Sequence, residues 1–540
     1  MGLEGLFERQ KRGAIALFNP PSPFLLDERV FPPLCLADIG GVLEAHGFSI
    51  DLYDLAVDSE HPKDWRAEVL RAARKNYVGF GITATSPQFP DACEILKLIR
   101  DVKSDSHVVI GGAHPSLMTQ LRRYKIAEFT SADSSLSADP ARLNQMLYEF
   151  DLNFKPLEKF SVIFEGEGEN RVHDVMDPMS ASRVLSGSKW FSGGIVLKED
   201  MPKLGIPARH LFNIETYNYS IRDVAGTSLR CMNVMSQRGC PFGCEFCSGR
   251  LGDMYKIVRS KTSDQIIREL RHMRKIHGAD AFMFFDDEFN LNTERTIELC
   301  NAMIQLRETE GIGYSWRAFI KSELLVKKPE IAEYMKRAGC VEVCTGVESG
   351  SPFILKHVIH KNTSPAINLA ARKIARDAGL RYKAFTMVGH AGETEADAMQ
   401  TLEWILEAKP DDFDVTVCTP YPGAPIYDRA TKIKDDLFVY DDSIDKKTKE
   451  RKKDPITGKE RAVRLYFRKP DYSQVQAFYK GVPGEYKSLV WTDDLSPEKI
   501  VQLREHIDNT ARERLGIAKL VRPSGIDQSM GAPPAYLFAK

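Results

Sequence analysis

The fold is decided by one stretch of the sequence, Cys240-Pro241-Phe242-Gly243-Cys244-Glu245-Phe246-Cys247. It gathers three of the chain's ten cysteines within a single short loop. Three thiolates at this spacing can hold three irons of a cubane iron–sulfur cluster and leave the fourth iron open. An open iron can bind a small ligand and pass an electron to it. The stretch therefore predicts a four-iron cluster with one open coordination position.

A zinc site and a chance grouping of buried cysteines stay open as alternatives for the triplet. Structural zinc usually takes four ligands that arrive as two pairs, and no fourth cysteine or histidine follows at zinc spacing. A disulfide framework would need denser cysteines. The remaining cysteines are scattered, as expected of small buried side chains: Cys35, Cys93, Cys231, Cys300, Cys340, Cys344 and Cys418.

Outward from this loop, apolar strands alternate with amphipathic helices over residues 225–430. Six strands are expected, the first ending near Val234 and the others at 281–285, 314–319, 341–347, 385–389 and 413–417. Thr262 and Gln265 fit a capping box at the start of one helix. Six successive βα units favour a partial (β/α)6 barrel of the TIM type. The cysteine loop follows its first strand, at the end where ligands bind.

The first 190 residues show the same alternation and predict a doubly wound, Rossmann-like α/β domain. Its strands end in small or glycine-rich loops, and ligands of open parallel sheets bind at such loops. The candidate residues are Asn19, Pro20, Thr83, Thr85, Ser86, Gly111, Gly112, His114, Glu165, Gly166 and Glu167. Residues 116–160 are less regular and predict an insertion or mobile loop. Residues 191–224 are expected to connect the domains, and 431–540 to form a small, mainly helical domain with a solvated basic loop at 446–453.

Composition excludes several classes of protein. The chain has 540 residues, which favours two or three domains. Its net charge of −1, from 74 basic and 75 acidic residues, offers no global field for nucleic acid. No apolar run is long enough for a membrane span, and the N-terminus does not resemble a secretory signal. We expect a cytoplasmic protein with a small-molecule substrate.

The cysteine loop resembles the signature of radical S-adenosylmethionine (SAM) enzymes, in which an aromatic residue precedes the third cysteine, here Phe246. The resemblance covers about 200 residues. It implies a [4Fe-4S] cluster on Cys240, Cys244 and Cys247, SAM at the open iron, and an external one-electron reductant of the flavodoxin or ferredoxin type.

The same resemblance implies SAM contacts at later strand ends, from Phe246, Asp286, Asp287, Glu288, Arg317, Glu348 and Gly389. The three consecutive carboxylates have a simpler alternative, since they could cap the next helix. Arg317 lies on an apolar strand and needs a partner. A methionine carboxylate would serve, and so would an internal salt bridge.

The N-terminal domain is similar to the cobalamin-binding domain that precedes the barrel in one branch of this family. The resemblance implies that the candidate residues at its strand ends, from Asn19 to Glu167 as given above, bind cobalamin. The Asp-x-His-x-x-Gly motif of some cobalamin proteins is absent, so a vestigial domain without cofactor stays open. His114 has a purely structural alternative.

Together these features predict a cobalamin-dependent C-methyltransferase that acts on an unactivated carbon through a 5′-deoxyadenosyl radical and methylcobalamin. The alternatives are a cyclase, rearrangement or carbon–carbon coupling enzyme of the same branch, and a non-catalytic iron–sulfur or cobalamin sensor.

Overall fold

The computed structural model describes residues 12–22, 31–55, 65–217, 219–222, 227–250, 252–454, 458–474 and 486–518. The chain forms two compact units. The described part of the first comprises residues 12–22, 32–55 and 65–217, together with the distant segment Asp471–Gln474. The remaining described residues belong to the second unit, which contains the cysteine loop.

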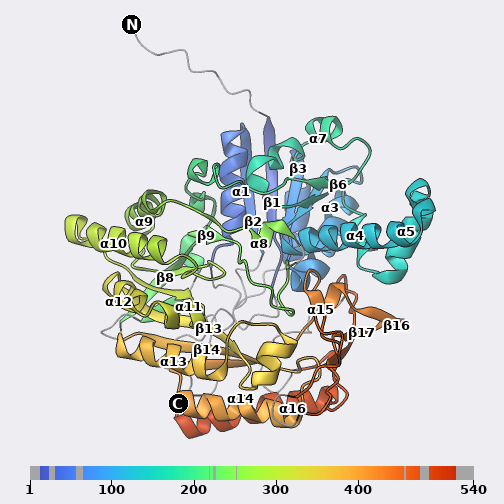
Figure 1. Cartoon of the computed structure of the whole chain (residues 1–540). Helices are drawn as coiled ribbons and strands as arrows, with labels where there is room; N and C mark the ends of the chain where they lie inside the picture. The colour runs from blue at the N-terminus through green and yellow to red at the C-terminus, as the bar shows by residue number, and fades with distance from the viewer. Residues whose placement is uncertain are drawn as a thin grey trace. The chain divides into compact units, whose positions relative to one another are not determined.

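The first unit is built on a six-stranded, fully parallel sheet with strand order β2-β1-β3-β4-β5-β6. Its strands β1, β2, β3 and β6 are labelled in Figure 1. Apolar residues fill its strands, and those of β1 and β3–β5 are largely buried. The strands are β1 (Gly13–Asn19), β2 (Phe48–Asp54), β3 (Tyr77–Thr83), β4 (Val108–Gly111), β5 (Val162–Glu165) and β6 (Trp190–Ser192). The doubly wound domain predicted from the sequence is confirmed.

Helices connect these strands, as parallel pairing requires. They are α1 (Leu34–Ala45), α2 (Trp65–Ala73), α3 (Phe89–Val102), α4 (Ala113–Ala132), α5 (Pro140–Phe150), α6 (Phe154–Leu157) and α7 (Pro178–Val184). The region 116–160, expected to be irregular, is therefore largely helical. Asp139 caps α5 through the Arg142 backbone N–H, with Pro140 at the first helical position. The serines and alanines near 131–139 form the turn between two helices.

The second unit contains a sheet of order β15-β14-β13-β12-β11-β8-β7. Its six consecutive parallel strands confirm the predicted partial barrel; only the edge strand β7 is antiparallel. They are β8 (Ser228–Val234), β11 (Ala281–Phe284), β12 (Ser315–Phe319), β13 (Cys340–Glu348), β14 (Arg381–Val388) and β15 (Asp412–Val417), with β7 at Ser220–Arg222. A short ribbon, β9 (Gln237–Arg238) and β10 (Arg259–Ser260), flanks the cysteine loop.

Helices of the second unit begin where the sequence provides caps. Thr262 and Gln265 form the expected capping box of α9, which Gly278 ends in a left-handed conformation. The helices are α8 (Asp253–Lys256), α9 (Ser263–His277), α10 (Thr293–Glu310), α11 (Ser322–Lys327), α12 (Glu330–Arg337), α13 (Pro365–Asp377), α14 (Glu395–Ala408) and α15 (Pro425–Asp428). The long helices α9, α10, α13 and α14 alternate with the barrel strands along the chain.

The last part of the chain differs from the mainly helical domain that we expected. It contains α16 (Pro497–Leu515), as predicted, but also a four-stranded antiparallel sheet of order β16-β17-β18-β19. These strands are β16 (Thr431–Lys434), β17 (Leu437–Asp441), β18 (Arg464–Arg468) and β19 (Val490–Trp491). Burial alternates along β17 and β18, which is the period of a half-buried strand. Long insertions between these short strands hid the pattern.

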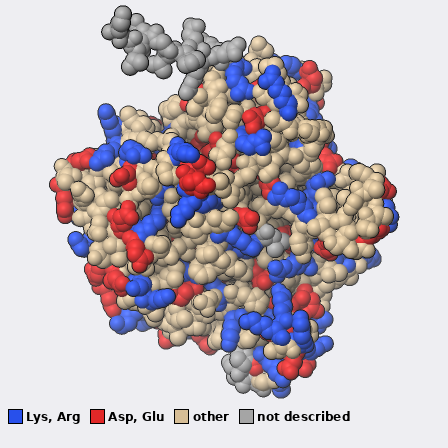
Figure 2. Space-filling model, turned by 45° about the horizontal axis from the view of Figure 1, so that its top comes forward, with Lys and Arg blue, Asp and Glu red and all other residues tan. Residues whose placement is uncertain are grey.

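Charges of both signs are interspersed over the face drawn in Figure 2. This distribution agrees with the net charge of −1 and shows no single-sign field on that face. No helix in the described part of the chain is long and apolar enough to cross a membrane.

Candidate functional site

The cysteine loop leaves the carboxyl end of β8 and is tied to its surroundings by backbone hydrogen bonds. Cys240 N–H donates to the Tyr255 carbonyl at 2.8 Å, and Glu245 N–H to the Ile359 carbonyl at 3.1 Å. Gly239, just before the first cysteine, has φ of 87°, and a Cβ there would meet the Ile257 carbonyl. The glycine therefore lets the loop turn tightly against its neighbouring chain.

Arg250 holds the loop from inside. Its guanidinium Nη1 donates to the carbonyls of Cys240 at 2.7 Å and Phe242 at 3.2 Å. Its own backbone N–H donates to the Gly423 carbonyl at 3.1 Å. The residue is 5% exposed. Its positive charge acts to lower the pKa of the Cys240 and Cys247 thiols.

Glu245 anchors the opposite side of the loop. It is buried and accepts from the Tyr440 hydroxyl at 3.2 Å, and Arg429 lies 3.4 Å from its carboxylate. Its carbonyl also accepts the Ile426 N–H at 3.1 Å. The loop is thereby fixed to α15 and β17 of the same unit.

The three thiols lie close enough to influence one another electrostatically. Burial raises the pKa of each of Cys240, Cys244 and Cys247. Positive charge acts in the opposite direction, from Arg250 at Cys240 and Cys247 and from Lys361 and Lys321 at Cys244. This donor set suits an anionic iron–sulfur cluster. Among the described residues no three His, Cys, Asp or Glu side chains form a preassembled metal site, so the ligand assignment depends on spacing and chemistry.

Glu288, after β11, supplies the clearest sign of a ligand in this unit. One of its carboxylate oxygens, Oε2, is enclosed and has no hydrogen-bond partner among the described residues. Burial raises the pKa of Glu288 to about 7, although the positive charges of Lys361 and Lys321 act to lower it. An enclosed acceptor with no donor is costly unless a ligand provides one. The ammonium of an amino acid is such a donor.

Two lysines that sequence reasoning missed stand beside this carboxylate. Lys321 is 2% exposed and lies over the Phe242 ring of the cysteine loop, 4.0 Å from its centroid. Lys361 donates to Glu348 Oε1 at 2.9 Å and to the Gly346 carbonyl at 2.5 Å. Burial alone would lower the pKa of Lys361, but the neighbouring Glu348 and Cys244 raise it above its usual range. The strand ends of β11, β12 and β13 thus bring carboxylates and ammonium groups to the cysteine loop.

Glu348 itself ends β13 in a strained conformation, with φ of 65°. A non-glycine residue with positive φ is uncommon and marks a position that its surroundings hold in place. The strand also shifts register against β14 between Gly346 and Glu348. These features turn the carboxylate toward Lys361.

The other two carboxylates after β11 have different surroundings. Asp286 is 1% exposed and accepts from Ser236 N–H at 2.6 Å, from the Ser236 hydroxyl and from Gln237 N–H at 3.1 Å. Its role is to tie the chain after β8 to the chain after β11. Asp287 is exposed, and its neighbours include the Arg250 guanidinium and the Gly239 backbone N–H.

Arg317 has an internal partner. It is 1% exposed, and Glu342 on β13 lies 3.1 Å from its guanidinium. The Tyr219 hydroxyl accepts from Nη1 and the Cys344 sulfur from Nη2, both at 2.6 Å. The geometry therefore favours the salt-bridge alternative over a methionine carboxylate, because a ligand would have to displace three partners.

Gly389, at the end of β14, is required by packing. Its φ is 85°, and a Cβ there would meet Ile500 of α16 at 3.2 Å. The following residues form a buried turn in which Glu393 accepts from the N–H groups of Gly389 and His390. Burial raises the pKa of Glu393 to about 8 and lowers that of His390 to about 4. Phe246 lies edge-on to His390 at 6.4 Å, which places it at this turn.

In the first unit, the predicted residues lie at the carboxyl ends of the adjacent strands β1, β3, β4 and β5. Gln88, which sequence reasoning missed, joins two of these ends. Its side-chain amide donates to Asn19 Oδ1 at 3.2 Å, the Pro20 carbonyl at 2.9 Å and Ser22 Oγ at 2.9 Å. Its oxygen accepts from Thr85 N–H at 3.1 Å. The capping box Thr85–Gln88 was the available signal.

The ends of β4 and β5 are shaped by glycines and one ion pair. Gly112 has φ of 97°, and a Cβ there would meet Thr83 Oγ1 at 2.6 Å. Gly166 has φ of 98°, and a Cβ there would meet the Gly194 carbonyl.

Glu165 is 5% exposed and forms a two-pronged pair with Arg123 of α4. Glu167 accepts from the Val196 N–H at 2.6 Å. Gly111 continues β4 beside Thr83.

His114 is fully buried, and burial lowers its pKa to about 3. Nδ1 contacts the Ser86 hydroxyl at 2.9 Å, whereas Nε2 has no hydrogen-bond partner in the described part of the chain. The ring stacks on Phe89 at 4.3 Å and meets the edge of Tyr472 at 5.6 Å. The neutral imidazole therefore keeps one unsatisfied polar atom at the strand ends, as a ligand site would.

Comparison with known proteins gives two matches along the chain. Residues 28–134 match the B12 binding domain, and residues 234–405 match the Radical SAM superfamily. The chain is 28% identical over 360 residues to an uncharacterized methyltransferase of Pyrococcus horikoshii, covering 65% of this chain and 68% of that protein. It is 23% identical over 424 residues to the anaerobic magnesium-protoporphyrin IX monomethyl ester cyclase of Cereibacter sphaeroides, covering 76% of this chain but only 62% of the cyclase.

Among solved structures, the chain is similar to the radical SAM methyltransferase TsrM from Kitasatospora setae with cobalamin and a [4Fe-4S] cluster bound. The TM-score is 0.58 at 13% identity, covering 93% of this chain and 88% of that one. The cobalamin-dependent SAM radical enzyme OxsB gives a TM-score of 0.53 at 16% identity, covering 73% of this chain and 51% of that one. At these identities the likeness concerns the fold.

Proposed function

Because this chain is a radical SAM enzyme that carries a B12-binding domain, we propose that it is a cobalamin-dependent C-methyltransferase acting on an unactivated carbon of a small molecule. The cofactors of this class are a [4Fe-4S] cluster, SAM and cobalamin. Its relatives include proteins named as methyltransferases, among them the Pyrococcus protein and a bacteriochlorophyllide d methyltransferase.

One observation supports the proposal most strongly. Several enclosed polar atoms in each unit have no partner among the described residues, and they include Glu288 Oε2 in the second unit and His114 Nε2 in the first. Both lie after the carboxyl ends of parallel strands, where such folds bind ligands. Two binding domains in one chain fit an enzyme that combines two cofactors.

When bound, the cluster and SAM supply a 5′-deoxyadenosyl radical, and cobalamin supplies a carrier for a methyl group. The chain's own residues bind these cofactors and orient them. We assign the cluster ligands to Cys240, Cys244 and Cys247. Glu288 accepts from the methionine ammonium, and Glu348 accepts from a ribose hydroxyl.

The methionine carboxylate is assigned to the two lysines rather than to Arg317. Lys321 and Lys361 are buried and act electrostatically on Cys244 and Glu288. Each has one carboxylate partner, Glu323 at 2.7 Å and Glu348 at 2.9 Å, whereas Arg317 is held by three partners. Phe246 packs near the adenine. In the first unit, Asn19, Ser86, Gly112 and His114 are assigned to the cobalamin side, with Gln88 as the residue that fixes the loops.

A cyclase is the second candidate, because the magnesium-protoporphyrin cyclases align over 76% of this chain. A cyclase forms a carbon–carbon bond without adding a methyl group. For either candidate we propose a cytoplasmic protein, a small-molecule substrate and an external flavodoxin- or ferredoxin-type reductant. The domains proposed are residues 1–190, the connector 191–224, the barrel 225–430 and the C-terminal domain 431–540.

The test uses the full chain, produced with cobalamin and reconstituted with iron and sulfide. A methyltransferase would retain corrin, visible by its absorbance. Supplied with methyl-labelled SAM and a strong one-electron reductant to reduce the cobalt, it would give labelled corrin and S-adenosylhomocysteine. A corrin-free chain, or a corrin that takes up no label, would contradict the proposed methyl transfer and favour the cyclase.

A further inference from the structure

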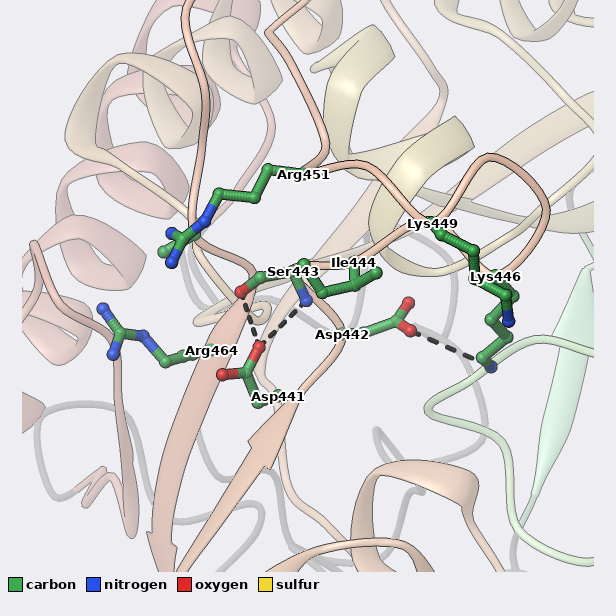
Figure 3. Close-up of a pocket in the computed structure, with 9 residues that line it drawn as sticks. Asp441, Asp442, Ser443, Ile444, Lys446, Lys449, Arg451 and Arg464 are labelled. Carbon is green, nitrogen blue, oxygen red and sulfur yellow. Dashed lines mark hydrogen bonds and ion pairs between the residues drawn. The ribbon is translucent and has the colours of Figure 1, made fainter.

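A pocket of about 370 Å³ lies in the C-terminal sheet of the second unit, between the ends of β17 and β18 (Figure 3). Two acidic and four basic side chains line it. The lining residues are Asp441, Asp442, Ser443, Ile444, Lys446, Lys449, Arg451, Ala462 and Arg464. Most belong to the hairpin 443–452, which overlaps the basic segment 446–453 that the sequence indicated to be a solvated loop.

The hairpin is a defined structure. Ile444 and Arg451 form an antiparallel bridge, and Lys452 N–H donates to the Ser443 carbonyl at 2.8 Å. At its tip, the Asp445 carboxylate accepts from the N–H groups of Lys447 at 2.8 Å and Thr448 at 3.0 Å. Its basic side chains are therefore presented from a fixed backbone, which lowers the entropy lost when they bind a ligand.

Both lining carboxylates are already engaged. Asp441 accepts from Ser443 N–H at 2.9 Å and from its hydroxyl at 2.5 Å. Asp442 is 7% exposed and contacts Lys452 Nζ at 2.6 Å and His360 Nε2 at 3.0 Å. The charge of Asp442 is therefore compensated by its basic partners, whereas Asp441 keeps its negative charge and is outnumbered by the four cations that line the pocket.

The four cations are less completely paired. Figure 3 shows the guanidinium groups of Arg451 and Arg464 on one side of the pocket and the amines of Lys446 and Lys449 on the other. Lys446 lies 3.8 Å from Asp442, and Arg451 3.8 Å from the exposed Glu460. Arg464 has a 3.0 Å pair with Asp493 on the surface, and such exposed pairs are weak.

We propose that this pocket binds a small molecule with two separated anionic groups, each a phosphate or a carboxylate. The two arginines offer planar forks suited to bidentate pairing with one group, and the two lysines offer point charges for the other. The volume suits a small metabolite. The proposal is independent of methyl transfer, since it involves none of the residues assigned to the cofactors.

The pocket has a direct link to the cofactor region. Asp442 lines it and bonds to His360, and the next residue, Lys361, contacts Glu348. A dianion that draws Lys446 away from Asp442 changes the charge beside this chain of contacts. Contacts through the adjacent residues His360 and Lys361 therefore connect the pocket to Glu348.

The experiment is isothermal titration of the full chain at fixed ionic strength with four probes: inorganic pyrophosphate, orthophosphate, succinate and acetate. We expect at least one two-group probe to bind at least tenfold more tightly than its single-group counterpart. Pyrophosphate and succinate distinguish a phosphate ligand from a carboxylate one. Equal affinity of each two-group probe and its counterpart, or no binding by any probe, would overturn the proposal.

Variants locate the site. The double variant Arg451→Gln/Arg464→Gln removes the arginine side of the pocket and is expected to weaken the tighter probe at least tenfold. The matched control Lys447→Gln/Lys453→Gln removes the same charge from exposed positions of the same segment that do not line the pocket. Equal weakening by both double variants, with unchanged melting temperatures, would reduce the effect to general surface charge and refute the site.

Discussion

Replacing Arg250 by glutamine tests how the cysteine loop is held. The wild-type guanidinium bonds to the carbonyls of Cys240 and Phe242 at 2.7 and 3.2 Å. Hydrogen bonds from a charged donor contribute roughly 1.5–3 kcal/mol each. Counting the shorter bond fully and the longer one in part gives about 3 kcal/mol, which corresponds to about a hundredfold change in an equilibrium constant. A glutamine is too short to reach both carbonyls.

We therefore expect the reconstituted Arg250→Gln chain to lose its cluster to an iron chelator faster than wild type, by up to about a hundredfold when the whole difference acts on the barrier to cluster loss. The assay follows the decay of the cluster's visible absorbance, with iron and sulfide counted per chain. Arg250→Lys is the matched control, because it keeps the charge but not the fork and should fall between the two. Wild-type cluster retention in Arg250→Gln, with a normal melting temperature, would refute the assigned role of Arg250.

Three further substitutions test other parts of the account. Glu348→Gln should weaken equilibrium binding of SAM by about tenfold to a hundredfold, because a charged acceptor is lost; unchanged affinity would exclude Glu348 as a contact. Glu393 has a raised pKa of about 8, so the folded state binds its proton more tightly than the unfolded state. Its contribution to stability is complete below pH 4.5 and is lost as the pH rises to 8, by up to about 5 kcal/mol. Glu393→Gln mimics the protonated form. Its free energy of unfolding in urea, relative to that of wild type, should therefore increase as pH rises, and a difference that stays constant with pH would contradict the assignment. Tyr472→Ala should expose His114 and raise its pKa from about 3 toward 6.5, as followed by NMR of labelled histidine; an unmoved pKa would show that Tyr472 does not shield it.

Local patterns in the sequence were sufficient for the barrel. Its elements are marked by signals that depend only on residues close together in the sequence. Examples are the capping boxes at Thr262 and Thr394 and the apolar runs of β11 and β15. Each therefore predicts its own element without knowledge of the rest of the fold. The order of the six parallel strands then follows from short βα connections.

The partners of buried charges could not be predicted in the same way. Arg317 and Glu342 are far apart in the sequence, yet parallel pairing of β12 and β13 places them directly opposite each other. That pairing decided between a ligand and a salt bridge for Arg317. Lys361 carried no signal, because it follows a helical turn after β13 rather than a strand. Lys321 did carry a signal in the sequence, because it is a charged residue shortly after a buried strand.

Contacts between segments that lie far apart in the sequence could not be predicted either. Tyr472 packs against His114 from over three hundred residues away, and its N–H donates to Asn153 Oδ1 at 2.7 Å. No local periodicity predicts such a contact. The antiparallel sheet of the C-terminal region was missed for a similar reason, since β17 and β18 pair across a long insertion.

The most direct test of the central claim is the detection of 5′-deoxyadenosine by mass spectrometry. The full chain and its Cys244→Ala variant are reconstituted with iron and sulfide and supplied with SAM and a strong one-electron reductant. We expect the wild-type chain to form 5′-deoxyadenosine and the variant to form none. A wild-type chain with a complete four-iron cluster that yields no 5′-deoxyadenosine, or a variant that yields as much as wild type, would contradict it.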